Sequence, residues 1–186
     1  MNDPQEFDAY GAAQEKLPRS RWPEVIGIIG IILSVIIFVD KLDDLLTLTW
    51  TEDKWTRVVG ADLADLIVRS LPPLGWRLAS SLVHMALAVL LFAGSLALRG
   101  RRRSGVSRCR AWAVLAIGWV AVEIGWAIWW LSRYTGGIMG IAPATWQGYA
   151  AFGIAVALVI LLAFPVFLLI WLSRSHVRAE YEGWPG

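Results

Sequence analysis

The chain has 186 residues, of which 57% are hydrophobic, and its formal net charge at pH 7 is only +2. Its mean hydropathy is +0.56, and the apolar residues form blocks longer than a soluble core of this size requires. This composition excludes an ordinary soluble domain and predicts an all-α integral membrane protein.

Four apolar blocks predict four membrane-spanning helices. Such a helix needs about 20 apolar residues to cross a hydrocarbon core about 30 Å thick. The predicted spans lie at about residues 24–46, 77–98, 111–131 and 148–172. They divide the chain into a polar cytoplasmic leader (1–22), a membrane domain (23–172) and a cytoplasmic tail (173–186). We therefore expect a four-transmembrane-helix bundle.

The first block is the shortest, because Asp40 and Lys41 interrupt it. Its apolar face continues to Leu46, so we expect the helix to run past these charges into the interface. A cleaved signal peptide is the alternative interpretation. It is disfavoured because a long polar segment precedes the block and residues 39–44 form a poor cleavage site.

The arginines predict the orientation of the spans. Six of them lie between the second and third blocks, with no acid among them: Arg99, Arg101, Arg102, Arg103, Arg108 and Arg110. Short loops rich in arginine stay in the cytoplasm, whereas segment 40–75 carries seven acids against four bases and is expected outside. Both termini are therefore predicted to be cytoplasmic.

The same arginines have a second interpretation, as contacts to nucleic acid. They lie between two spans, however, and lack interleaved aromatic residues or a recognisable binding motif. Topology and contact with anionic lipid headgroups explain them better. We expect no nucleic-acid partner.

The segment between the first two spans predicts an external amphipathic helix. From Trp55 to about Ser70, apolar residues fall at helical spacing: Val58, Val59, Leu63, Leu66 and Ile67. The following Leu71, Pro72 and Pro73 end the pattern. The helix is either a packed linker on the membrane surface or a docking site for a partner.

Glu123 is a single acid inside the third apolar block. Steps of four and three residues place it on one helical face with Trp112, Ala116, Trp119, Trp126 and Trp130. A carboxyl group that faces lipid is costly, so this face is expected to point at protein. A neighbouring seam of Ala111, Gly118 and Gly125 would allow another backbone to approach closely.

The second block carries a stripe of small and polar residues around His84: Ser81, His84, Ala88, Leu91 and Ser95. His84 and Glu123 each lie about 12 Å from the external end of their span, at 1.5 Å per residue. Because the two spans are antiparallel neighbours, we predict that His84 and Glu123 form a candidate intramembrane polar pair. The pair is either neutral or ionic, and acts either as polar glue between helices or as a proton- or ligand-handling site.

Trp119 and Trp126 are a possible aromatic lining beside Glu123. Aromatic faces around an acid can hold an organic cation. Against this, Trp126 lies near the outer interface, where tryptophan commonly anchors a span, and only Trp119 is deep.

No catalytic constellation is visible. Cys109 is the only cysteine, which leaves disulfide exchange and thiolate zinc sites without their residues. His84 is the only histidine within a span, so bis-histidine haem ligation within one chain is excluded. No phosphate-binding or dinucleotide motif occurs. We expect no catalytic residue, no metal site and no cofactor, and hence no enzyme.

Two stretches carry a resemblance. "RWPEVIGIIGIILS" (21–34) and "CRAWAVLAIGWVAVEIG" (109–125) resemble the corresponding parts of a family of small uncharacterised four-span inner-membrane proteins of Gram-negative bacteria. The resemblance implies a location in the bacterial cytoplasmic membrane. It implies no activity, cofactor or catalytic residue.

The sequence favours a structural or accessory membrane protein that acts through helix packing or its external segment. Its expected partners are the lipid bilayer and either a second copy or another membrane protein. The alternative is a small oligomeric transporter that uses Glu123 and His84 as a proton- or cation-responsive site.

Overall fold

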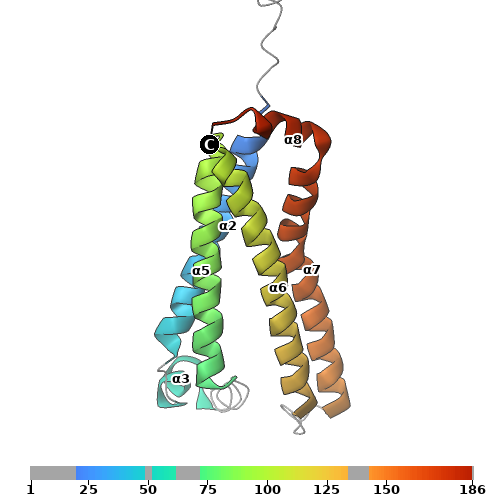
Figure 1. Cartoon of the computed structure of the whole chain (residues 1–186). Coiled ribbons are helices and arrows are strands. Elements are labelled where there is room, and N and C mark those ends of the chain that lie inside the picture. The colour runs from blue at the N-terminus through green and yellow to red at the C-terminus, as the bar shows by residue number, and fades with distance from the viewer. Residues whose placement is uncertain (1–19, 49–51, 62–71, 134–142, 186) are drawn as a thin grey trace, which may run out of the picture.

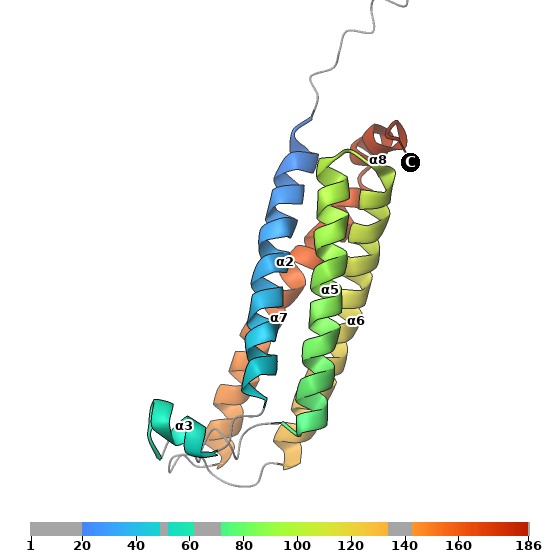
Figure 2. The same cartoon turned by 90° about the vertical axis from the view of Figure 1, so that its left-hand side faces the viewer.

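The computed structural model describes residues 20–48, 52–61, 72–133 and 143–185, which contain helices and no strand. Four long helices run side by side (Figures 1 and 2). They are α2 (Trp22–Thr47), α5 (Leu74–Arg99), α6 (Arg103–Arg133) and α7 (Pro143–Ser173). Two short helices are α3 (Glu52–Val59) and α8 (Ser175–Glu182). The prediction of an all-α chain is confirmed.

Several of these helices have the length and composition of membrane spans. Within the described ranges, α2, α5 and the Arg103–Trp129 part of α6 each qualify alone. Leu161–Ser173 of α7 qualifies together with α8, across a bend of 72°, which gives three or up to four candidate spans. α2 continues past Asp40 and Lys41 before it ends at Thr47.

The helices pack in the order of the chain, with α2 on α5, α5 on α6, and α6 on α7. Small residues bring the first pair together. A Cβ atom built on Gly27 would lie 3.0 Å from the backbone oxygen of Ser95, and the buried Gly30 faces Ser95 and Leu91. Because no side chain separates the backbones there, α2 and α5 can make van der Waals contact over a long stretch.

The turn between α5 and α6 is much shorter than the sequence predicted. Only residues 100–102 separate the two helices, and α6 begins at Arg103 rather than near residue 111. Gly105 makes this possible, because a Cβ atom there would lie only 2.7 Å from the carbonyl carbon of Ala97 and from Cα of Leu98, and still closer to the backbone nitrogen of Leu98. The first turn of α6 therefore packs directly on the last turn of α5. We call the end of the molecule that carries this turn the arginine end.

The C-terminal segment closes the arginine end. After Ser173 the chain bends, and α8 lays Val177 and Tyr181 into the core, with 0% and 9% of their surfaces exposed. Trp184 then stacks on Trp22 of α2 at a ring distance of 5.5 Å. We call residues 175–185 the C-terminal clasp, because they tie α7 to the start of α2 across the ends of α5 and α6 (Figure 1).

Three of the six arginines hold this clasp. The guanidinium of Arg101 lies 3.4 Å from the carboxylate of Glu180, which also accepts a 2.6 Å hydrogen bond from Trp22 Nε1. The backbone N–H of Arg103 donates to the oxygen of Pro185, and Arg110 donates to the hydroxyl of Tyr181, both at 3.0 Å. These arginines therefore bind the protein's own C-terminal segment, a role beyond the topology signal predicted from the sequence.

The predicted external amphipathic helix lies only partly within the described residues. α3 begins before Trp55, at Glu52, and ends at Val59. Gly60 follows in the left-handed region with φ of 88°, so the continuous helix predicted from Trp55 is interrupted there. The predicted apolar positions Leu63, Leu66 and Ile67 lie outside the described residues.

Candidate functional site

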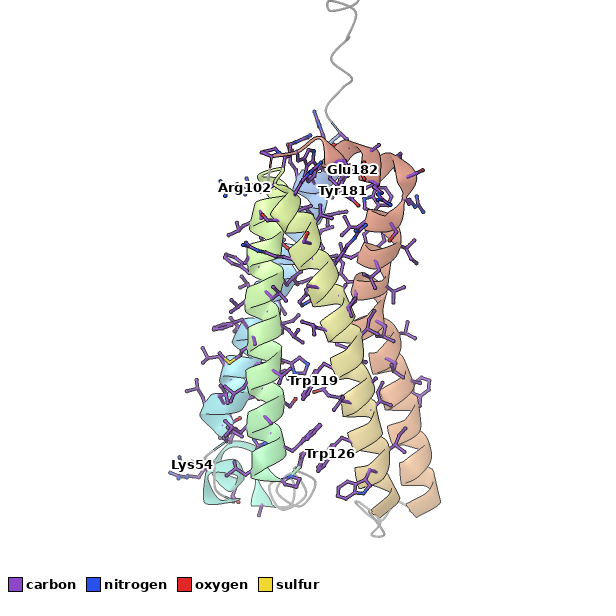
Figure 3. All side chains as sticks on the ribbon, in the orientation of Figure 1. Lys54, Arg102, Trp119, Trp126, Tyr181 and Glu182 are labelled. Carbon is purple, nitrogen blue, oxygen red and sulfur yellow. The ribbon has the colours of Figure 1, made fainter. Side chains whose placement is uncertain are left out.

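The candidate site lies between α5 and α6, in the half of the molecule away from the arginine end. The two helices are close at their shared turn and separate toward the opposite end (Figure 1). Side chains fill this widening space, and Trp119 and Trp126 of α6 lie in it (Figure 3). The same stripe holds Trp112 and Ala116 nearer the turn, where they are 5% and 9% exposed.

The structure brings His84 and Glu123 together. His84 Nε2 lies 3.6 Å from Glu123 Oε2, close enough for the two side chains to interact but too far for a direct hydrogen bond. The other carboxylate oxygen, Oε1, accepts a 2.7 Å hydrogen bond from the hydroxyl of Ser80. The His84 and Glu123 side chains remain 18% and 26% exposed, so this polar cluster is not sealed in a dry core.

The hydrogen bond on the far side of the His84 ring places one of its ring protons on Nδ1. His84 Nδ1 lies 3.0 Å from the backbone oxygen of Ser80, and a carbonyl oxygen can only accept, so Nδ1 donates. Nε2 then carries a proton only in the imidazolium form. Nε2 is therefore the ring nitrogen that faces Glu123, 3.6 Å from Oε2.

A stack of tryptophans lies beside this pair. Trp76, from the first turn of α5, stacks on Trp126 at 4.3 Å and on Trp119 at 6.0 Å, with interplanar angles of 11° and 16°. His84 meets Trp119 edge-on at 6.3 Å. Because the faces of the rings cover one another, these faces are not free to surround an organic cation.

Two residues of this cluster, Ser80 and Trp76, were not predicted from the sequence. Ser80 lies one helical turn before His84 and Trp76 one turn before that, so a step of four residues would have found both. The predicted small and polar face of this helix instead contained Ser81, Leu91 and Ser95. Those residues are buried, and Leu91 and Ser95 pack against the glycines of α2.

Other predicted positions play no part in the cluster. Gly118 and Gly125 are exposed, and a Cβ atom on either would meet no described atom within 4 Å, so this seam does not pack against a neighbour. The side chain of Trp130 lies outside the described residues. Cys109 is buried between α5 and α6, with 1% of its surface exposed. Among the described residues, no group of three metal-ligating side chains comes together.

These features define a class of protein. Its long apolar helices, with large hydrophobic side chains exposed along their outer faces, are those of a multi-pass integral membrane protein. No family model, no curated protein and no solved structure matches the chain.

Proposed function

We propose that this chain is a four-span protein of the bacterial cytoplasmic membrane, with both termini in the cytoplasm. α7 is the fourth span, since it is 31 residues long and contains no charged residue or histidine. The six arginines at the α5–α6 turn orient the spans by the positive-inside rule. The resemblance to four-span inner-membrane proteins supports the bacterial location.

We propose that its role is structural or accessory rather than enzymatic, exercised through helix packing. The observation that carries this proposal is the contact of Ser80 and His84 on α5 with Glu123 on α6. It joins the two helices where they diverge from their shared turn. Polar contacts between spans contribute on the order of 0.6–2 kcal/mol each, enough to set helix spacing. The helices, held at this spacing, would present their outer faces to a second copy or to another membrane protein.

A double-mutant cycle tests the contact. We expect His84→Ala and Glu123→Ala each to lower the free energy of unfolding by about 1 kcal/mol, and the double variant to lose less than the sum, because the second change removes a partner already lost. The measurement is unfolding in mixed micelles, titrated with a denaturing detergent. His84→Ala with Cys109→Ala is the control pair, since these residues do not touch. Additive losses for the His84 and Glu123 pair would contradict the role.

A small oligomeric transporter that uses Glu123 and His84 is the second candidate. It is favoured by one observation, the 26% exposure of the Glu123 side chain. In a transporter, Glu123→Gln should abolish pH-dependent uptake while leaving the protein folded. In an accessory protein, the same change should cost only some stability, and a membrane partner should co-purify with the wild-type chain.

A further inference from the structure

A polar pocket lies next to the cluster, at the end of the molecule opposite the arginine end. Its volume is about 250 Å³, and it lies between the last turns of α2 and the first turns of α5. The lining residues are Asp44, Pro72, Trp76, Arg77, Ser80 and Ser81. The Asp44 side chain is 49% exposed, so the pocket meets the solvent on that side. Its size and its polar lining suit several water molecules.

Ser80 belongs both to this pocket and to the polar cluster. It lines the pocket, and its hydroxyl donates the 2.7 Å hydrogen bond to Glu123 Oε1. A serine hydroxyl can donate one hydrogen bond and accept others at the same time. A water molecule in the pocket can therefore donate to Ser80 while Ser80 donates to the carboxylate, which makes a continuous chain of hydrogen bonds.

Few charged groups surround this chain of hydrogen bonds. On the pocket side, α2 brings Asp44, whose carboxylate is 2.8 Å from Lys41 Nζ, and α5 brings Arg77. On the inner side, α5 brings His84, and Glu123 is the only acid of α6. α7 has no acid, base or histidine. Asp44 shares Lys41 with Asp40, which is 2.9 Å from the same ammonium, at the exposed rim of the pocket, whereas His84 and Glu123 are the ionisable pair on its inner side.

We propose that His84 and Glu123 form a protonation site that exchanges protons with the external solution through Ser80 and this pocket. In the uptake step, Ser80 passes its hydroxyl proton to Glu123 Oε1 and takes a proton from a hydronium ion in the pocket. The products are a carboxylic acid and a water molecule, and the release step is the reverse. Trp76, which stacks on Trp119 and Trp126, also lines the pocket, so the path to Ser80 runs along this stack.

The proton path is a property beyond helix packing, and only the side of the membrane on which it opens rests on the proposed orientation. Cysteine accessibility tests the path and the orientation separately. Ser80→Cys is made in a Cys109→Ala background and exposed to a membrane-impermeant thiol reagent on either side of the membrane. Lys54→Cys on α3, which projects from the molecule (Figure 3), reports one side, and Arg178→Cys on α8 reports the other. Ser95→Cys, at a site only 2% exposed on the same helix as Ser80, is the buried control.

We expect Ser80→Cys to react from the side on which Lys54→Cys reacts, at least about tenfold faster than Ser95→Cys, a difference of about 1.4 kcal/mol in barrier. A Ser80→Cys rate equal to that of Ser95→Cys would overturn the path. Reaction of both Lys54→Cys and Ser80→Cys from the cytoplasmic side would instead overturn the proposed orientation, and with it the external access.

Infrared spectroscopy of the reconstituted chain tests the proton itself. The carbonyl band of protonated Glu123, identified by its loss in Glu123→Gln, should respond to a jump in external pH. Ser80→Ala should slow this response about tenfold, the effect of about 1.4 kcal/mol in barrier, while Ser80→Thr keeps the hydroxyl and the rate. An unchanged rate in Ser80→Ala, or a band that follows internal pH, would overturn the proposal. Ser80→Thr and the cysteine variants keep the test decisive if Ser80→Ala does not fold.

Discussion

Replacing Gly105 by alanine is expected to lower the free energy of unfolding by about 3 kcal/mol, the upper end of the range for overpacked sites. The new methyl group would lie 2.7 Å from the carbonyl carbon of Ala97 and from the Cα atom of Leu98. Both are backbone atoms, so no rotamer change relieves the overlap. The first turn of α6 would have to lift off α5. Denaturing-detergent titration followed by tryptophan fluorescence measures the loss, since the chain has 12 tryptophans.

Gly118→Ala is the matched control for Gly105→Ala. Both glycines lie in α6, but Gly118 is exposed and a Cβ atom there meets no described atom within 4 Å. Alanine is the better helix former by about 1 kcal/mol, so Gly118→Ala should leave stability unchanged or raise it slightly. Equal losses from the two changes would mean that the packing of α6 on α5 at the turn is not the cause.

Tyr181→Ala is expected to lower the free energy of unfolding by a similar amount, about 3 kcal/mol. This loss is large for a residue that lies only a few positions from the C-terminus. The side chain is 9% exposed, accepts a 3.0 Å hydrogen bond from Arg110 and lies 5.5 Å from its guanidinium at the ring face. Truncating a buried aromatic residue typically costs about 3–5 kcal/mol. The same detergent titration measures the effect, and increased cleavage of α8 by added protease provides a second readout.

Arg178→Ala is the control within the same helix. Its side chain is 66% exposed and pairs with Glu182 at 2.8 Å, an i,i+4 ion pair on the surface. Such pairs contribute about 0.3–0.5 kcal/mol, so the loss should be small. If Tyr181→Ala is no worse than Arg178→Ala, the C-terminal clasp does not hold the helices together.

Parts of the candidate site were predictable, and parts were not. Glu123 and His84 were found because ionisable groups in apolar spans are rare and have to face inward. Ser80 was missed because Ser80 and Ser81 lie on adjacent parts of the same helical face. Which of them points at α6 and which at α2 depends on how α5 is rotated between its neighbours. Hydropathy carries no information about that rotation.

The sequence by itself determined the class of structure. A hydrocarbon environment requires long apolar helices whose backbone groups bond within each segment, so composition and block length were sufficient to predict an all-α chain with several spans. Only the tertiary structure decided how the ends of the helices are joined. The bond of Trp22 to Glu180 links residues 158 positions apart, and the close approach at Gly105 depends on two backbones meeting. Neither contact leaves a periodic pattern in the sequence, because each depends on side chains from separate helices converging in space.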